Sequence, residues 1–424
     1  MTAKYWLFGL FLAAFGIVAA QNPQKSANVP PFYDPASLWV DSVMQSLSPQ
    51  ERIAQLFQVA AYSNRDAAHE REINRLIREY GIGGVIFFQG GPDRQARQCN
   101  QYQAASRVPL LVSMDAEWGI GMRLDSTINY PYQMSLGAIQ DDRLIYEMGD
   151  EIARQFRRLG MQVNFAPVVD VNNNAANPVI NYRAFGEDKQ LVTRKGLAYM
   201  KGLQDGQILT SAKHFPGHGD TDVDSHKDLP QIPHGLDRLQ NLELYPFGQL
   251  MQQGLSGVMV AHLNIPALDN TPNQPSTLSR PIVHGLLQEQ MGFRGIIFTD
   301  ALNMQGVAKY YETGRVEVEA IKAGNDALVF PQDVPKAIAA IQAAIRTGEL
   351  NQMEIDRKCR KILMAKYWAG LAEYQPIQRQ NLYRDLHTKE AHMLNRKLVA
   401  STLTLIRNRN NLLPFKQLES RRFM

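Results

Sequence analysis

A short apolar run passes directly into a polar loop in the stretch Gly206-Gln-Ile-Leu-Thr-Ser-Ala-Lys-His-Phe-Pro-Gly-His-Gly-Asp-Thr-Asp-Val-Asp-Ser-His226. Residues 206–213 predict a short buried strand. Residues 213–226 hold three histidines and three aspartates, and a proline and two glycines disfavour a regular helix there. In α/β proteins, catalytic and binding residues usually lie in the polar loops that follow strands. The stretch therefore predicts an α/β fold with its functional site at this loop.

Apolar runs recur at wide spacing along the chain, and segments with helical periodicity separate them. Near-continuous apolar strands that alternate with helices are typical of a parallel sheet covered by helices. Eight such runs favour a (β/α)8 TIM-type barrel, and no Gly-x-Gly-x-x-Gly motif supports a dinucleotide-binding fold. The expected strands lie in residues 56–60, 84–88, 109–115, 162–170, 208–214, 257–262, 295–300 and 326–330.

The composition is that of a soluble globular protein, with 45% hydrophobic and 20% charged residues. The 45 basic and 41 acidic side chains give a net charge of +4 without a long run of one sign, so nucleic-acid binding gains no support. Two cysteines, Cys99 and Cys359, define no disulfide framework, and the sequence leaves their redox state open.

Residues 1–20 predict a secretory signal peptide. Lys4 supplies a positive start, residues 6–18 are apolar, and Ala19-Ala20 offers small residues for cleavage. The apolar run is short for a membrane span of about 20 residues. We therefore expect an exported protein, periplasmic or extracellular, with no membrane span in the mature chain and an N-terminal lead over residues 21–37.

The sequence pattern changes after the region expected to form the barrel, residues 38–371. Residues 387–400 predict a helix and residues 403–407 a strand. We therefore expect residues 372–424 to hold a linker and the beginning of a second α/β domain, which is too short to build a core alone.

Polar residues end several of the apolar runs. In a barrel these strand ends meet on one face, so residues far apart in the sequence can share one pocket. Each residue alone could simply leave the core at a strand end, but together they favour a site. They are Asp115, Asp170, Lys213 with His214, His262 and Asp300.

Asp300 is a candidate nucleophile because it directly follows an apolar run, although it could instead cap a helix over residues 301–309. Asp224 and His226 are a second candidate pair. Two residues apart in an extended loop, their side chains lie on the same side, so the carboxylate can orient the imidazole. A histidine held in this way can protonate a leaving group near neutral pH.

Four further residues could orient a polyhydroxylated or acidic ligand: Arg123, Arg183, Lys213 and His214. Surface ion pairs are the alternative for the two arginines.

A metal-dependent barrel hydrolase is an alternative reading of the same loop. The His-x-x-x-His spacing would need a helix to bring both rings onto one face, and Pro216 and Gly217 interrupt it. We therefore expect no metal. The potential ligands would be His214, His218, Asp220, Asp222, Asp224, His226 and His262.

Several ordered motifs resemble glycoside hydrolase family 3 and, within it, the bacterial β-N-acetylglucosaminidase branch. Lys213-His-Phe-Pro-Gly-His-Gly-Asp-Thr with Asp224-Ser-His226 is similar to the distinctive loop of that branch, and residues 295–304 to the family's nucleophile segment. The resemblance covers roughly residues 41–367. Further matches are Asn164-Phe-Ala-Pro-Val-Val-Asp170-Val, Asn177-Pro with Arg183-Ala-Phe-Gly186, and Ala323-Gly-Asn-Asp326.

The resemblance implies a retaining β-N-acetylglucosaminidase without a cofactor, which acts on peptidoglycan or chitin-type oligosaccharides. Asp300 would be the nucleophile that forms a glycosyl-enzyme, and His226 the general acid/base with Asp224 as its partner. This differs from the two carboxylates usual in retaining glycosidases. The residues implied to bind the β-linked amino sugar are Asp115, Arg123, Arg183, Lys213 and His214.

Trp118 departs from the family pattern, because Asp115-Ala-Glu-Trp118-Gly stands where the family usually has Asp-x-Glu-Gly-Gly. The ring could stack on a sugar or pack against the rim. The functional alternatives are a β-glucosidase-type member of the family and a catalytically silent glycan-binding protein. The sequence predicts neither the natural glycan nor the oligomeric state.

Overall fold

The computed structural model describes residues 28–223, 228–309, 311–416 and 418–420. Each of the eight expected runs contains a strand, and the run over residues 208–214 contains two, β5 and β6. The strands are β1 (Phe57–Ala61), β2 (Gly84–Phe87), β3 (Leu111–Met114), β4 (Val163–Asn164), β5 (Leu209–Thr210), β6 (Ala212–Phe215), β7 (Gly257–Val260), β8 (Ile296–Thr299) and β9 (Leu328–Val329).

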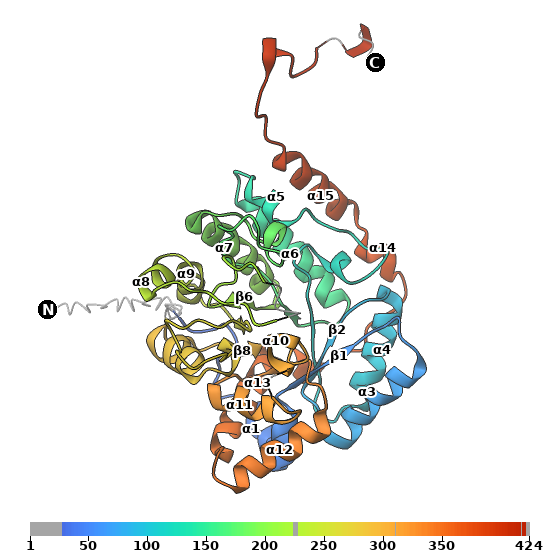
Figure 1. The fold of residues 1–424 in the computed structure, drawn as a ribbon. Helices are drawn as coiled ribbons and strands as arrows, with labels where there is room; N and C mark the ends of the chain where they lie inside the picture. The colour runs from blue at the N-terminus through green and yellow to red at the C-terminus, as the bar shows by residue number, and fades with distance from the viewer. Residues whose placement is uncertain (1–27, 224–227, 310, 417, 421–424) are drawn as a thin grey trace, which may run out of the picture.

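The strands form two parallel sheets, one of six strands in the order β5-β4-β3-β2-β1-β9 and one of three in the order β6-β7-β8 (Figure 1). Isolated bridges link the sheets on both sides. Val168 pairs with Lys213 at β6, and Phe298 of β8 pairs with Ala327, next to β9. The expected α/β class is confirmed, with a parallel-sheet half-barrel at its centre.

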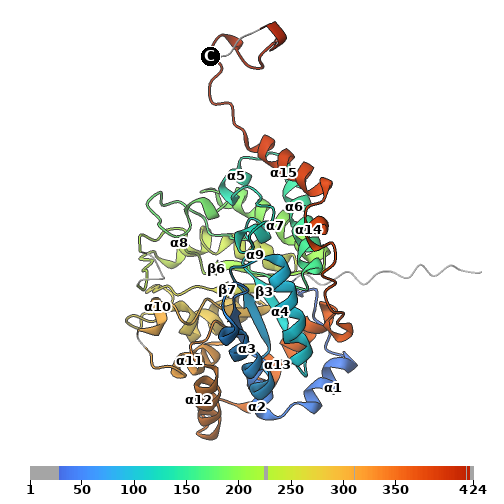
Figure 2. The same ribbon diagram turned by 90° about the vertical axis from the view of Figure 1, so that its right-hand side faces the viewer.

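Helices cover the outside of the sheets (Figures 1 and 2). Their bounds are α1 (Leu38–Ser46), α2 (Pro49–Ala54), α3 (Ala67–Tyr80), α4 (Pro92–Ala105), α5 (Gln133–Gly137), α6 (Arg143–Arg158), α7 (Lys189–Asp205), α8 (Leu236–Asn241), α9 (Tyr245–Gln252), α10 (Gln305–Ala308), α11 (Arg315–Ala323), α12 (Val334–Arg346), α13 (Gln352–Trp368), α14 (Leu382–Leu386) and α15 (Lys389–Thr402), with a π-helical segment η4 (Pro281–Gln290).

Local sequence explains where helices start and how closely they pack. The Ser48 hydroxyl accepts the Glu51 backbone N–H at 3.3 Å, and the Glu51 carboxylate accepts that of Ser48 at 2.8 Å, so the two residues cap α2 reciprocally. Helices α6 and α7 meet at Gly202. A Cβ atom there would lie 2.3 Å from the carbonyl oxygen of Tyr146, so this contact requires glycine.

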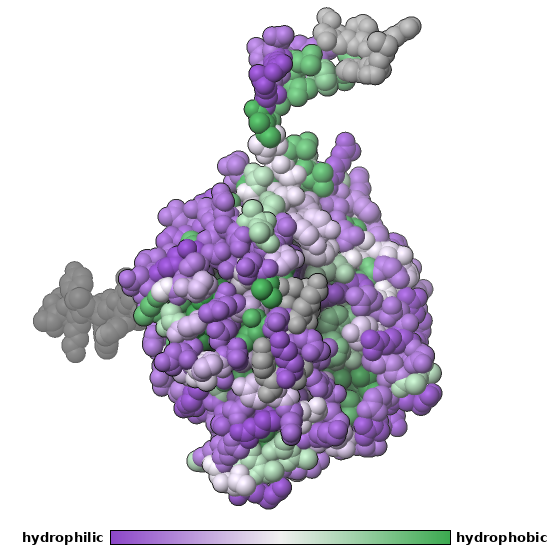
Figure 3. Space-filling model, viewed as in Figure 1, coloured by the Kyte–Doolittle hydropathy of each residue, from purple (hydrophilic) through white to green (hydrophobic). Residues whose placement is uncertain are grey.

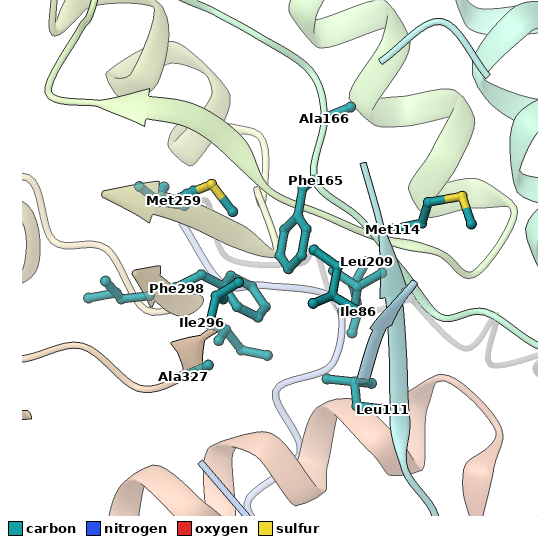
Figure 4. Packing of buried hydrophobic residues seen from close by; sticks show 14 of the residues in the cluster. Ile86, Leu111, Met114, Phe165, Ala166, Leu209, Met259, Ile296, Phe298 and Ala327 are labelled. Carbon is teal, nitrogen blue, oxygen red and sulfur yellow. The ribbon is translucent and has the colours of Figure 1, made fainter. Parts of the chain in front are cut away.

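Apolar side chains from both sheets fill the interior (Figure 4). Phe165 and Phe298 point toward each other, with ring centroids 5.1 Å apart and an interplanar angle of 79°. This edge-to-face arrangement is favourable for aromatic rings. Because side chains fill the space between the strands, a ligand site is expected at the strand ends.

The helix expected over residues 387–400 is present as α15, and α14 precedes it. Arg158 of α6 binds Asp385 of α14, with 3.1 Å between Nε and Oδ2, so this part of the chain packs against helix α6. Helix α15 also contacts α5 and α6, and α14 contacts α4.

The strand expected over residues 403–407 is not present. That segment has no regular structure and extends away from the body (Figures 1 and 2). Leu403 is 80% exposed and Ile406 is 94% exposed, and apolar residues gather on this extension in Figure 3. The prediction fails because a strand needs a neighbour to pair with, and none lies beside this segment among the described residues.

Cys99 and Cys359 are both buried and free, so they form no disulfide. Burial raises the pKa of each thiol to about 12, which keeps both unreactive. None of the helices in the described ranges is long and apolar enough to cross a membrane. The expected signal peptide, residues 1–20, lies outside these ranges.

Candidate functional site

A pocket of about 430 Å³ opens at the carboxyl ends of the strands. Asp115 enters it after β3, Lys213 and His214 from β6, and Asp300 after β8. The expected convergence of strand ends is therefore observed. Asp224 and His226 lie outside the described residues. The predicted residues that line the pocket are Asp115, Arg123, Arg183, Lys213, His214 and Asp300.

Asp115 is held between two cations. Its Oδ1 accepts a hydrogen bond from Lys213 Nζ at 2.8 Å, and its Oδ2 accepts one from Arg123 Nη2 at 2.7 Å. Arg123 also lies over the ring of Phe88, 4.9 Å from its centroid. Only 18% of the Arg123 side chain is exposed, so this ion pair belongs to the pocket rather than the surface.

Glu117 is a fully buried carboxylate that sequence reasoning did not single out. Arg183 binds it with Nε and Nη2 at 3.0 and 2.8 Å, and Lys213 Nζ lies 2.9 Å from Oε1. Arginine can form this two-pronged contact and lysine cannot. The result is a row of alternating charges: Arg123, Asp115, Lys213, Glu117 and Arg183. The signal for Glu117 in the sequence was its place two residues after Asp115.

His214 continues this row. Its Nδ1 lies 2.7 Å from Asp170 Oδ2, and its Nε2 lies 3.2 Å from Arg183 Nη2. Because a guanidinium only donates, Nε2 must accept, and the ring is neutral with its proton on Nδ1. Asp170 also accepts the backbone N–H of His218 at 2.7 Å. Asp170 therefore orients the His214 ring from behind the pocket.

The charges of the pocket are set by competition between burial and neighbouring ions. Burial raises the pKa of Asp115, but Lys213 and Arg123 outweigh it and hold that pKa well below its usual range. Burial acts in the same way on Glu117, and its cations lower its pKa to about 2. Burial lowers the pKa of His218 to about 4. At neutral pH both carboxylates are ionised and His218 is neutral.

Asp300 does not cap a helix over residues 301–309. Helix α10 begins at Gln305, and Met304 occupies its N-cap position. Asp300 Oδ1 accepts the backbone N–H of Ala301 at 2.7 Å, and His262 Nε2 lies 3.1 Å from the carbonyl oxygen of Ala301. Because that carbonyl can only accept, His262 donates to it. The two contacts to Ala301 therefore fix the backbone directly after Asp300.

Aromatic rings form two walls of the pocket. Phe88 and Phe330 lie on one side, with ring centroids 5.5 Å apart. Phe330 has a φ of 52°, in the left-handed region that bulky residues rarely adopt. On the other side Tyr132 lies 4.8 Å from Trp118 and 4.6 Å from Tyr182 between centroids. Trp118 and Tyr182 line the pocket, so the residue that departs from the family pattern lies beside Asp115 and Arg183 in it.

Charged side chains anchor the loop that follows β6. Asp220 Oδ2 lies 2.8 Å from His234 Nε2 and 3.1 Å from Arg238 Nη2. Arg238 also binds the buried Glu243, with 3.2 Å between its Nε and Oε1. These contacts hold the start of the loop that continues into Asp224, outside the described residues.

Four of the side chains named as potential metal ligands have other partners: His214, His218, Asp220 and His262. Thr221 Oγ1 lies 2.8 Å from His218 Nδ1, and Thr277 Oγ1 lies 2.7 Å from His262 Nδ1. In the part of the chain that the structure describes, no three His, Cys, Asp or Glu side chains form a group that could hold a metal ion.

Comparison with known proteins shows the family to which the chain is similar. The model of the glycosyl hydrolase family 3 N-terminal domain matches residues 49–365. β-Hexosaminidase A of Pseudoalteromonas piscicida is 34% identical over 327 residues, which are 70% of this chain and 55% of that protein. This chain therefore spans little more than half the length of that relative.

Two further proteins share most of this chain. A protein of Cellulomonas fimi named β-N-acetylglucosaminidase/β-glucosidase is 25% identical over 389 residues, 90% of this chain and 68% of its own length. The structure of a family 3 β-N-acetylglucosaminidase from Paenibacillus sp. str. FPU-7 superposes with a TM-score of 0.78 at 33% identity. That superposition covers 84% of this chain and 69% of the other.

Proposed function

Since the chain belongs to glycosyl hydrolase family 3, we propose that it is a retaining exo-β-N-acetylglucosaminidase. It would release β-linked N-acetylglucosamine from the end of an oligosaccharide through a covalent glycosyl-enzyme. The relatives named as hexosaminidases and N-acetylglucosaminidases support this activity. The observation that carries the proposal is the position of Asp300 at a strand end, where it lines a pocket together with Arg123, Arg183 and Lys213.

In this proposal Asp300 attacks the anomeric carbon and the bond to the leaving oxygen breaks. Asp115 and Glu117 are poor nucleophiles, because Lys213 and an arginine occupy the oxygens of each. Hydrolysis of the glycosyl-Asp300 bond by water then returns the carboxylate and gives net retention at the anomeric carbon.

The leaving oxygen needs a proton, and few of the described pocket residues could donate it. Low pKa values keep Asp115 and Glu117 ionised at neutral pH, and His218 is neutral because its pKa is lowered to about 4. His214 presents an unprotonated Nε2 to Arg183. These groups are unsuited to act as the acid, which supports His226 as acid/base with Asp224 as its orienting partner.

The row of charges would hold the sugar before the cleaved bond. Arg123, Arg183 and Lys213 can donate to its hydroxyl and carbonyl oxygens, while Asp115 can accept from a hydroxyl. His214, fixed by Asp170, would complete this set. Trp118 and Tyr182 would offer an apolar face to a ring, as aromatic side chains do in sugar sites.

We extend the proposal to the setting of the protein. The expected signal peptide, residues 1–20, would direct export, so the substrate would be an envelope or extracellular glycan such as peptidoglycan or chitin fragments. We also propose that the two sheets, bridged on both sides, make up one (β/α)8-type barrel. The exposed apolar residues of 403–407 would begin a second packing unit.

An assay of aryl β-N-acetylglucosaminide against aryl β-glucoside, with and without chelator, tests the proposal. We expect turnover of the amino sugar, little turnover of the glucoside, and no effect of the chelator. Preference for the glucoside would favour the β-glucosidase alternative. The name of the Cellulomonas fimi relative includes both activities. Binding of N-acetylglucosamine oligomers without turnover would identify a silent glycan-binding protein.

A further inference from the structure

A second cavity, of about 450 Å³, lies at the opposite end of the strands from the catalytic pocket. Asp326 and Gly295, which precede β9 and β8, mark this amino end. Asp326 lines the cavity, and Lys361 Nζ reaches both Asp326 Oδ2 at 2.7 Å and the Gly295 carbonyl oxygen at 3.1 Å. Active sites of barrel enzymes lie at the carboxyl ends, so a cavity here suits binding rather than catalysis.

Six cationic side chains and two carboxylates line this cavity, which we call the basic cavity. The carboxylates are Asp326 and Glu354. Charges of one sign around a concave wall reinforce each other and attract a ligand of the opposite sign. The cations are Arg280, Arg294, Arg357, Lys358, Arg360 and Lys361.

One face of helix α13 supplies most of this charge. Lys361 follows Arg357 by four residues and Lys358 by three, so it lies beside both on the helix surface, and all three line the cavity. The segment from η4 to β8 contributes Arg280 and Arg294 across the cavity. Two separate parts of the chain therefore direct cations toward one space.

The carboxylates neutralise this charge only in part. Lys361 binds Asp326, Arg360 binds Asp41, which does not line the cavity, and Lys358 Nζ lies 3.4 Å from Glu354 Oε1. Within the described ranges, neither Arg294 nor Arg357 forms an ion pair.

Lys358 is the strongest sign of a built site. Its residue is 3% exposed, yet its one close carboxylate is too far away for a strong hydrogen bond. Burial lowers its pKa, because the charge has lost water without gaining a close partner. An anion in the basic cavity would supply that partner.

We propose that the basic cavity binds a small, multiply charged oxyanion, with two or more phosphate or carboxylate groups. The guanidinium groups of Arg294 and Arg357 match the planar oxygen pairs of such groups. Phosphate and carboxylate share this chemistry, and the test separates them. The proposal is independent of the reaction in the catalytic pocket.

Isothermal titration of the full chain with inorganic pyrophosphate and, separately, with citrate tests the proposal at low salt. We expect one site that binds at least one of the two anions and weakens as salt increases. The double variant Arg294→Gln/Arg357→Gln should bind about tenfold or more weakly, because two charge-assisted contacts are lost. The anion that binds more tightly identifies the group the cavity prefers.

The matched control is Arg71→Gln/Arg78→Gln, which removes the same charge from two exposed arginines on helix α3. It should bind the anion like the wild type, and both double variants should hydrolyse aryl β-N-acetylglucosaminide like the wild type. Three results would overturn the proposal: no binding of either anion, equal weakening in the control, or unchanged binding in Arg294→Gln/Arg357→Gln.

Discussion

Arg183 binds Glu117 with two parallel hydrogen bonds, of 3.0 and 2.8 Å, and none of the Glu117 side chain is exposed. Removal of one partner from such a pair leaves a buried charge without compensation. We expect Glu117→Gln to lower the free energy of unfolding by about 2–4 kcal/mol, as measured by urea denaturation. In the control Glu79→Gln, whose exposed carboxylate pairs with Arg75, the loss should stay below about 1 kcal/mol. Similar losses in both variants would contradict the role of Glu117.

The stability that Glu117 provides should depend on pH in the acid range. The pKa of this carboxyl is about 2 in the folded protein and near 4.5 in the unfolded chain. A lowered pKa contributes stability that is complete above the unfolded value and is lost as the pH falls to the folded value. The difference between wild type and Glu117→Gln should therefore shrink between pH 4.5 and about 2. A constant difference across this range would show that the variant acts through packing alone.

Asp300→Asn should abolish turnover while the fold stays intact, because the amide cannot form the glycosyl-enzyme. We expect kcat for an aryl β-N-acetylglucosaminide to fall roughly a thousandfold or more, with an unchanged thermal midpoint. The control Asp237→Asn changes an aspartate in the first turn of α8 and should keep full activity. Wild-type-like activity in purified Asp300→Asn would remove this residue as the nucleophile.

His226→Ala separates an acid from a residue that merely binds. General acid catalysis contributes about 10²–10⁴-fold, and a leaving group that departs without a proton needs none of it. We expect a loss of about a hundredfold on N-acetylglucosamine disaccharides and a much smaller loss on dinitrophenyl β-N-acetylglucosaminide. The exposed His392 on α15 offers the control, and His392→Ala should leave both rates unchanged. Equal losses on both substrates would argue against the acid role.

Much of the fold could be predicted because its signals are local. Apolar runs identified the strands, and the convergence of strand ends brought Asp115 and Asp300 into one pocket. Glu117 was missed because its importance comes from Arg183, 66 positions away, and its place two residues after Asp115 does not reveal that pair. The strand expected over residues 403–407 failed for the opposite reason. Its apolar pattern was clear, but a strand depends on a neighbour that local sequence does not reveal.

Tyr182 offers a test of the aromatic wall beside the charges. Its ring lies 6.4 Å from Trp118, and the two would stack on sugar rings of a longer chain. We expect Tyr182→Ala to raise KM severalfold for N-acetylglucosamine oligomers and less for the aryl monosaccharide, since an aromatic contact is worth about 0.5–1.5 kcal/mol. The control Tyr383→Ala removes a ring of similar exposure on α14, 46% against 47%, and should change neither KM. An equal rise for both substrates would place Tyr182 at the cleaved sugar instead.

Lys366 should make the protein more stable in alkali than at neutral pH. It is fully buried on α13, where its Nζ lies 2.6 Å from Gln55 Oε1, and burial lowers its pKa from 10.5 to about 7. Between these values the unfolded chain binds the proton and the folded one does not, so stability rises with pH. At pH 7 and below, the folded protein holds a charge in an apolar setting.

We expect Lys366→Met to raise the free energy of unfolding by about 1–4 kcal/mol at pH 7. The cost of leaving Gln55 Oε1 without its hydrogen-bond donor reduces this gain. This gain should fade by pH 10.5 in urea denaturation, whereas the exposed control Lys336→Met should show little change at either pH. A variant less stable than the wild type by the same amount at both pH values would show that folding does not lower the pKa of Lys366.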